Sequence, residues 1–185
     1  MQILHKLCVI TLWISLGIAL SACSAPRIHD YSANQPTLTP EQFFNGQLSA
    51  HGVLKNRQGK VTRWFNATIA AHWQNGIGTL DEAFVFSDGE RQTRVWTLTP
   101  LPNSDPEIKR YSATAGDVKG EATVEVSGNA MFLKYTLMVP YKGKTLAVNI
   151  DDRMYQVNDD TIINQSVMTK WGFKVGEILL TIRRN

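Results

Sequence analysis

Three acidic side chains are the first candidates for chemistry in this sequence. Glycoside hydrolysis, for example, needs two carboxyl groups that flank the reacting bond at a defined separation. Asp81 and Glu82 are adjacent in a strand-like run, so they point to opposite faces and cannot form such a pair. Glu82 and Asp152 are far apart in the sequence, and only the fold could bring them together. The carboxylates alone therefore do not define a reaction.

Residues that could bind a metal or form a nucleophile and base are sparse. Beyond the N-terminal region the histidines are His29, His51 and His72, with no His-Glu-x-x-His motif and no Cys pair. The Asn-Asp-Asp run at 158–160 lacks the spacing of an EF-hand and is typical of a turn. A Gly-x-Ser-x-Gly elbow is also absent. We expect no metal, no cofactor and no catalytic residue, and an enzyme is the least favoured class.

Cys23 is a candidate for covalent modification. It follows Leu-Ser-Ala at the end of an apolar run, 7–20, that is preceded by one cation, Lys6. The run is too short to span a bilayer and ends in small residues, as secretory leaders do. Leu-Ser-Ala-Cys is the lipobox pattern of bacterial lipoproteins, so we expect residues 1–22 to be a signal peptide and Cys23 to be acylated. The alternatives are an ordinary leader cleaved after Ala22, or an uncleaved anchor.

The expected location is the bacterial cell envelope. Several acyl chains on one residue hold a protein stably on a membrane. Ser24, rather than an aspartate, follows Cys23 and favours the inner leaflet of the outer membrane, facing the periplasm. Cys8 would leave with the leader, so the folded part has no thiol and no disulfide framework. A net charge of +3 is too small to indicate a nucleic-acid partner.

The remainder divides into a tether and one domain. Residues 23–38 contain Pro26 and Pro36 among polar residues without periodicity, which is typical of a tether. The domain is expected over 39–185 and begins with a short helical turn, because Thr39-Pro40 with Gln42 matches a helix start. We expect this turn to close one end of the domain.

From Gly46 onward the sequence predicts an antiparallel barrel. Short runs rich in β-branched and aromatic residues alternate in polarity and are separated by turn dipeptides. These dipeptides are Gln58-Gly59, Asn75-Gly76, Asp88-Gly89, Gly128-Asn129 and Lys142-Gly143. A sheet of about eight to ten strands closes to remove its edges, so an all-β, up-and-down barrel is predicted. A β-sandwich is the alternative.

Two-residue turns fix the register, so the inward faces can be predicted. Around Asn75-Gly76, Phe65 faces Phe86 and Ile69 faces Glu82, which places Glu82 on the apolar face. The candidate residues lining an interior ligand site are Arg63, Glu82, Tyr135 and Asp152. The alternative is a set of inner ion pairs, with Arg63 as partner of Glu82 and Arg153 or Lys119 as partner of Asp152.

An outer surface patch is a second candidate. If Asp88-Gly89 is also a two-residue turn, Asp81, Arg94 and Trp96 share the polar face, where they could contact a partner. The alternative is a cross-strand ion pair beside a half-buried tryptophan. A slipped register in this hairpin would instead turn Asp81, Arg94 and Trp96 inward and Glu82 outward.

Several segments resemble a known family. They are Phe-Phe-Asn-Gly (43–46), Gly-Thr-Leu-Asp-Glu-Ala-Phe (78–84), Arg-Val-Trp-Thr-Leu (94–98), Ala-Gly-Asp-Val-Lys-Gly-Glu-Ala (115–122), Ser-Gly-Asn-Ala (127–130), Asp-Asp-Arg-Met-Tyr (151–155) and Phe-Lys-Val-Gly-Glu (173–177). The chain resembles domain-of-unknown-function family 3833 of proteobacterial lipoproteins. The resemblance implies a lipidated envelope protein and supplies no catalytic residue. The barrel is similar to lipocalins and other calycins by architecture only, which does not carry function.

Two functions follow as expectations. The first is a lipid-anchored protein, held to the membrane through Cys23, that binds a small hydrophobic or amphipathic ligand in its barrel. The second is a structural or assembly accessory whose barrel is packed solid and whose outer face, with Trp64 and Trp96, binds a protein. The interior volume discriminates between them, because a cavity favours ligand binding.

Overall fold

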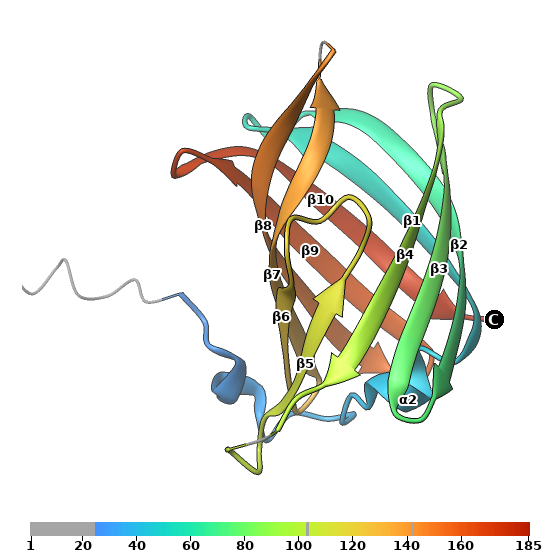
Figure 1. Ribbon diagram of the computed structural model, residues 1–185, viewed down its shortest axis with the longest axis vertical. Helices are drawn as coiled ribbons and strands as arrows, with labels where there is room; N and C mark the ends of the chain where they lie inside the picture. The colour runs from blue at the N-terminus through green and yellow to red at the C-terminus, as the bar shows by residue number, and fades with distance from the viewer. Residues whose placement is uncertain (1–24, 103, 142) are drawn as a thin grey trace, which may run out of the picture.

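Ten antiparallel strands follow two short helical turns in the computed structural model, which describes residues 25–102, 104–141 and 143–185 (Figure 1). The elements are η1 (Ile28–Tyr31), α2 (Pro40–Phe43), β1 (Gly46–Asn56), β2 (Val61–Gln74), β3 (Ile77–Phe86), β4 (Arg91–Pro100), β5 (Lys109–Thr114), β6 (Ala122–Ser127), β7 (Ala130–Tyr141), β8 (Lys144–Asn158), β9 (Thr161–Lys170) and β10 (Phe173–Arg184). Consecutive strands pair, and β1 also pairs with β10. The predicted up-and-down barrel is confirmed, and a sandwich does not form.

The turn chemistry explains most of the register. Asn75 and Gly76 both have positive φ, 53° and 78°, which is the geometry of a two-residue hairpin turn. The pairs Ile69–Glu82 and Phe65–Phe86 form as predicted. In the β6–β7–β8 hairpins Val124 pairs with Leu133, Tyr135 with Ile150 and Leu133 with Asp152, which is the register that two-residue turns at Gly128-Asn129 and Lys142-Gly143 predict. Alternate residues of these strands therefore point into the barrel.

The β3–β4 hairpin differs from the prediction by one residue. Phe86 N–H donates to Glu90 O at 2.9 Å, and Gly89 N–H donates to Phe86 O at 3.0 Å. This is a three-residue loop with Gly89 in the left-handed region at φ 85°. Glu82 therefore pairs with Arg94, whereas a two-residue turn would have paired it with Val95. A shift of one residue exchanges the two faces of a strand, so β4 presents Arg94 and Trp96 to the interior.

A plug of aromatic residues closes one end of the barrel. Phe43 and Phe44, at the end of α2, are 2% and 1% exposed, and their rings lie 5.1 Å apart. The Trp73 indole N–H donates to the Phe44 carbonyl at 2.8 Å, and the Tyr111 hydroxyl donates to Glu41 at 2.6 Å. The predicted helical turn is thus confirmed, and its main-chain and side-chain contacts hold it in the barrel. We call this the closed end, and the end with the β1–β2, β3–β4, β7–β8 and β9–β10 hairpins the open end (Figure 1).

The structure corrects the extent of the expected tether. From Ile28 onward the segment packs on the barrel, because Ile28 is 5% exposed against Ile108 and Phe132, and Leu38 is 2% exposed in the main core. Leu38 N–H also donates to Gly128 O at 2.8 Å. Ile28 and Leu38 are single apolar residues in a polar segment, and the absence of hydrophobic periodicity gave no indication that they are buried. The expected signal peptide and Cys23 lie outside the described residues.

The described residues contain the complete barrel. Each strand, both helical turns and both buried clusters lie within 28–184. A chain that begins at Ser24 therefore retains every element that the structure describes.

Candidate functional site

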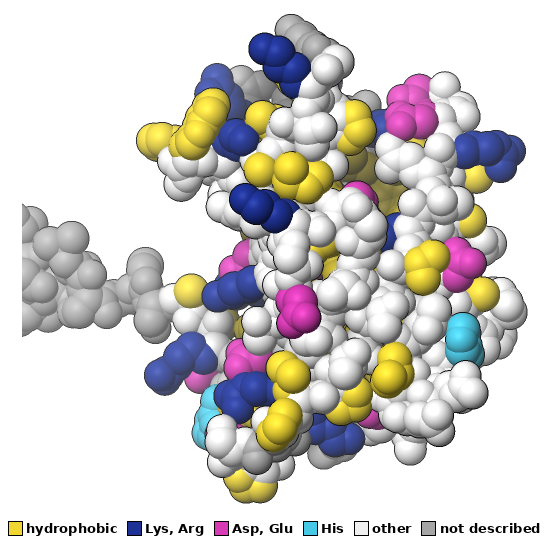
Figure 2. Space-filling view, in the orientation of Figure 1, with side chains coloured by type: hydrophobic (Ala, Val, Ile, Leu, Met, Phe, Trp, Pro, Cys, Tyr) yellow, Lys and Arg dark blue, Asp and Glu magenta, His cyan; other side chains and the backbone are white. Residues whose placement is uncertain are grey.

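A cavity of about 270 Å³ lies inside the barrel. Its walls come from β1–β4 and β7–β10, and most lining side chains are apolar, including Phe65, Ala67, Phe84, Leu133 and Ile178. Phe44 forms its floor at the closed end. Figure 2 shows apolar side chains inside the opening between the β3–β4 and β7–β8 hairpins. The inward alternation of the strands therefore leaves space that the side chains do not fill.

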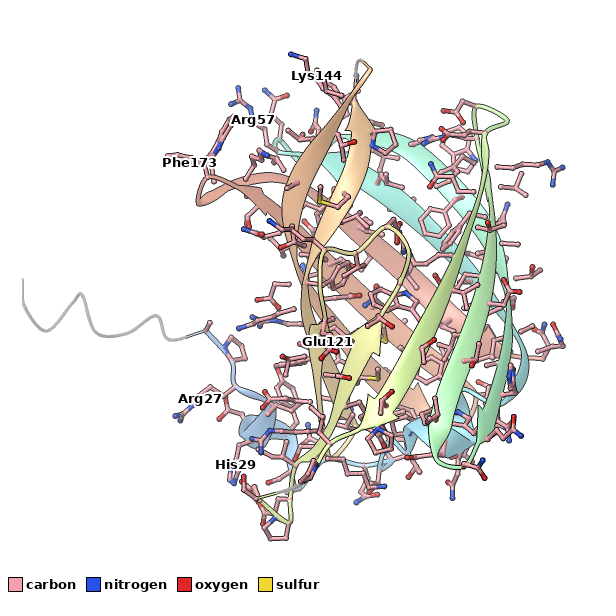
Figure 3. All side chains as sticks on the ribbon, viewed as in Figure 1. Arg27, His29, Arg57, Glu121, Lys144 and Phe173 are labelled. Atoms are coloured by element: carbon pink, nitrogen blue, oxygen red, sulfur yellow. The ribbon has the colours of Figure 1, made fainter. Side chains whose placement is uncertain are left out.

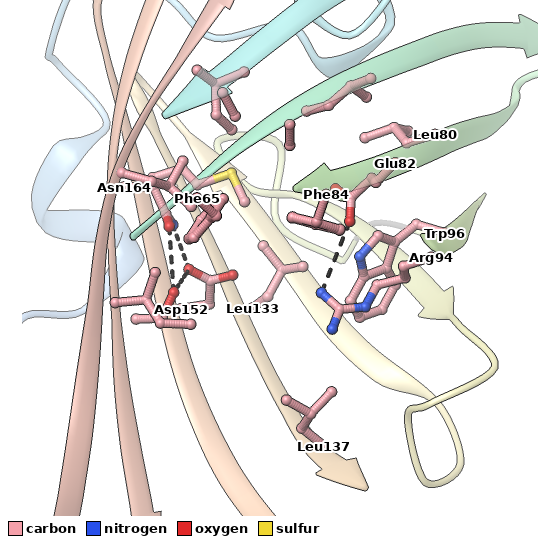
Figure 4. A pocket seen from close by; sticks show the side chains of 18 of the residues that line it. Phe65, Leu80, Glu82, Phe84, Arg94, Trp96, Leu133, Leu137, Asp152 and Asn164 are labelled. Atoms are coloured by element: carbon pink, nitrogen blue, oxygen red, sulfur yellow. Dashed lines mark hydrogen bonds and ion pairs between the residues drawn. The ribbon is translucent and has the colours of Figure 1, made fainter. Parts of the chain in front are cut away.

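One wall of the cavity carries an ion pair. Glu82 of β3 faces Arg94 of β4, with 3.8 Å between a carboxylate oxygen and a guanidinium nitrogen (Figure 4). Arg94 also donates to both oxygens of Asp117 at 2.7–3.0 Å, a bidentate contact. Asp117 belongs to the loop between β5 and β6, whose Val118 bridges to Leu137 of β7. Asp117 therefore holds the guanidinium more closely than Glu82 does.

The second polar group is a carboxylate on β8. Asp152 is 7% exposed, and its Oδ1 accepts hydrogen bonds from the Asn164 amide and, at 2.8 Å, from the Ser166 hydroxyl. Both donors are inward residues of β9, where Ser166 pairs directly with Asp152. The other oxygen points away from these donors, toward the cavity (Figure 4). Burial raises the pKa of Asp152, and its hydrogen bonds to Asn164 and Ser166 lower it by less.

Tyr135 and Trp96 complete the polar region. Their rings meet edge to face with centroids 5.2 Å apart. Burial, followed by the charge of Asp152, raises the pKa of Tyr135 well above its ordinary value. The phenol is therefore a neutral hydrogen-bonding group beside Asp152, Arg94 and Glu82.

All four predicted lining residues, Arg63, Glu82, Tyr135 and Asp152, line the cavity. Their ion-pair partners differ from those expected. Glu82, Tyr135 and Asp152 lie deep in it, while Arg63 lies near the open end and binds Asp88 and Glu90 at 2.6 and 2.5 Å. Arg63 is thus not the partner of Glu82. Arg153 binds Asp151 at 2.9 Å instead of Asp152. Lys119 pairs its main chain with Thr136.

The predicted outer patch does not form. Asp81 is exposed, but Arg94 and Trp96 line the cavity, and Trp96 is only 7% exposed. Asp81 stays outside and Glu82 stays inward, which corrects the alternative that a slipped register would exchange them. The residues that the sequence reasoning missed are Asp117, Asn164 and Ser166. Alternation along β9 could have placed Asn164 and Ser166 on the inward face with Ile162. Asp117 lies in a loop, where alternation does not apply, so its position could not be predicted in this way.

Glu82 makes the stability of the protein depend on pH. Burial, partly offset by Arg94, raises its pKa to about 7 from 4.5. The folded protein keeps this proton between pH 4.5 and 7, where the unfolded chain has released it, so the free energy of unfolding falls as pH rises through that window. A shift of this size corresponds to roughly 3 kcal/mol.

We therefore expect Glu82→Gln to be more stable than the original protein at pH 8 and nearly equal to it at pH 4. Urea unfolding across this range measures the difference, with Asp81→Asn on the exposed side of the same strand as the control. Parallel stability curves for Glu82→Gln and the original protein would show that Glu82 does not titrate in this window.

Other sites are not evident in the described parts of the chain. No three His, Cys, Asp or Glu side chains there gather as metal ligands, and His51 and His72 are exposed on the outer wall. Among the described residues, no helix is both long and apolar enough to cross a membrane.

Comparison with known proteins places the fold and the family. An S-type phycobiliprotein lyase from Guillardia theta has a similar structure, with a TM-score of 0.57 over 87% of this chain and 98% of that chain. At 11% identity this likeness shows the lipocalin-like fold alone. No curated protein matches the sequence. Residues 17–184 match the family described as "Protein of unknown function (DUF3833)". The chain therefore belongs to the DUF3833 family of proteins of unknown function.

Proposed function

We propose that this protein is a lipid-anchored envelope protein whose barrel binds a small amphipathic molecule. The observation that supports this most is the cavity of about 270 Å³, which is near the lower limit of small-molecule sites, about 300 Å³. A barrel that served only as a scaffold would fill this space with side chains. Small inward residues, Ala50 and Ala67 of the paired strands β1 and β2, keep it open.

The polar groups restrict the chemistry of the ligand. Its apolar part would lie against Phe65, Phe84 and Leu133, and its polar end near Glu82 and Asp152. The Arg94 guanidinium lies beside Glu82 and is already held by Asp117, so a ligand carboxylate would compete with these two carboxyls for it. A hydroxyl or a protonated amine would instead donate to these carboxyls. We infer an amphiphile with a hydrogen-bond-donating head.

The anchor is argued from the sequence. The lipobox Leu-Ser-Ala-Cys at 20–23 supports acylation of Cys23, and the described fold begins to pack at Ile28. Only residues 23–27 would separate the acyl chains from the barrel. Five extended residues reach at most about 18 Å, so the barrel would stay close to its membrane. Ser24 supports the outer membrane as that membrane.

Ligand binding is tested with a protein that begins at Ser24, purified without detergent. Native mass spectrometry should show a retained hydrophobe, and a fluorescent long-chain alcohol or amine should bind saturably. Preparations that are empty and take up no probe would exclude the proposed ligand site.

The anchor is tested separately with Cys23→Ser in the full chain. The original protein should incorporate labelled palmitate and remain with the membrane fraction, and the variant should not incorporate it. Equal incorporation would place the acyl chains elsewhere. Because this readout does not involve the cavity, anchoring and ligand binding can fail independently.

One observation supports the alternative function, a structural or assembly accessory that binds a protein on its outer wall. Trp64 is 58% exposed on the outer wall, beside a shallow groove formed with Val53, Ile163 and Leu179. Trp96, the other tryptophan proposed for this role, is interior. Crosslinking from position 64 should recover one stoichiometric protein if this alternative holds.

A further inference from the structure

The hairpin tip between β9 and β10 exposes aromatic side chains that the fold does not need. Trp171 and Phe173 are 84% and 76% exposed, the largest exposed fractions of any large hydrophobic residue described. Trp171 has φ 51°, a left-handed conformation that glycine or asparagine adopts more easily. The left-handed turn does not require a bulky ring, and the Trp171 side chain lies outside both buried clusters. Its presence points to a contact outside the protein.

The same part of the open end is strongly basic. The segments 55–61 and 170–177, on the neighbouring strands β1, β2, β9 and β10, contain five Lys and Arg residues and one acidic residue, Glu177. Lys174 binds Glu177 at 2.7 Å, whereas Arg57 and Lys60 are exposed. Figure 2 shows apolar and cationic side chains together on the protruding tip at the upper left. We name Arg57, Lys60, Lys170, Trp171 and Phe173 the aromatic-basic rim.

Contacts of Lys170 attach the aromatic-basic rim to the body of the barrel. The Lys170 ammonium donates to the carbonyl of Ala147 on β8 at 2.6 Å, and it lies 5.1 Å from the centre of the Trp171 ring. These contacts join the tip of β9 to the next strand of the barrel. The hairpin that carries Trp171 and Phe173 is therefore fixed to the neighbouring strand at the open end.

We propose that the aromatic-basic rim docks on the surface of an anionic lipid bilayer, with the cavity opening beside it. Tryptophan and phenylalanine enter the boundary between headgroups and acyl chains, and Lys and Arg attract anionic headgroups. Few acidic side chains oppose this contact. The described chain begins on the same side of the barrel: Figure 3 shows Arg27, Arg57 and Phe173 all pointing to the left of the view. A membrane on that side could be reached by both the N-terminal segment and the rim.

Vesicle co-sedimentation tests this with the protein that begins at Ser24, which has no leader and no acyl chain. The vesicles contain phosphatidylcholine alone or with phosphatidylglycerol, at low and high salt. The test variant is Trp171→Asn/Phe173→Thr, because asparagine tolerates the left-handed turn and threonine suits a strand. Arg57→Glu/Lys60→Glu tests the charges, and Trp64→Ala removes a matched exposed tryptophan from the outer wall. Thermal unfolding verifies that each variant is folded.

The original protein and Trp64→Ala should bind the phosphatidylglycerol vesicles, more weakly at high salt. Both double variants should bind at least about tenfold less tightly. Docking is overturned if the original protein ignores these vesicles at low salt, or if Trp171→Asn/Phe173→Thr binds as well as the original. A protein crosslinked from position 171, without vesicle binding, would likewise replace the membrane with a protein partner. Because the rim is outside the cavity, loss of docking leaves probe binding unchanged, and an empty cavity leaves docking unchanged.

Discussion

Replacing Ala67 with phenylalanine should eliminate ligand binding while the barrel remains folded. Ala67 is an inward residue of β2, 5% exposed, between Ala50 of β1 and Phe84 of β3. All three line the cavity. A phenyl ring at position 67 would project into a space of only about 270 Å³ and occupy the region where the apolar part of a ligand must lie.

The fold should tolerate this change because the ring enters an existing space. Overpacking of a filled core costs about 1–3 kcal/mol, and here the cavity accepts the added atoms. Titration with a fluorescent long-chain alcohol should show at least about a hundredfold weaker binding, or none. Ala70→Phe, on the exposed face of the same strand, is the matched control and should bind as the original does. Undiminished binding to Ala67→Phe would place the ligand outside the cavity.

The sequence predicted that Glu82 and Asp152 point inward because a two-residue turn fixes which residues pair across its hairpin. Asn75-Gly76 places Glu82 opposite Ile69, and the paired hairpins place Asp152 opposite Leu133. A carboxylate on an otherwise apolar face is visible in the sequence as a break in alternation. Its partner is not visible, because the partner depends on which strands meet across the barrel.

The error at Arg94 and Trp96 has a definite physical origin. Asp-Gly is compatible with a two-residue turn and with a three-residue loop that ends in a left-handed glycine, and these differ by one residue in register. In β4 the two inward choices are Arg94 with Trp96, or Val95. Hydrophobicity does not decide between them, because Trp96 and Leu98 share the face of Arg94, and Val95 shares its face with threonines. The observed register satisfies Arg94 through Asp117 and Glu82 and packs Trp96 against Tyr135, contacts that are tertiary.

The N-terminal segment shows a second limit of sequence patterns. Residues 28–38 have no period, because only the single turn η1 is regular and the rest of the segment packs on the barrel as irregular chain. Ile28 and Leu38 are nevertheless buried at separate places. An irregular segment that buries only isolated side chains has the same sequence pattern as a solvent-exposed tether, so the sequence does not distinguish the two. The closed end, by contrast, was predictable because Thr39-Pro40 begins a helix and two phenylalanines follow.

Phe44→Ala should cause the largest loss of stability of any single change proposed. Phe44 is 1% exposed at the closed end, where its ring packs on Phe43, and its side chain forms the floor of the cavity. Removing a buried phenylalanine ring costs about 3–5 kcal/mol, because the surroundings relax only partly around the void. The carbonyl of residue 44 still accepts from Trp73, so the main chain should stay in place and a void should remain.

Urea unfolding of the protein that begins at Ser24 measures this loss. Phe173→Ala is the control, since its ring is 76% exposed and its removal should change stability by less than about 0.5 kcal/mol. The void would adjoin the cavity, so Phe44→Ala should also admit a longer probe than the original protein does, provided that measurements are made below the unfolding transition. A loss as small as that of Phe173→Ala would mean that the helical turn only covers the barrel end and that Phe44 is not part of its core.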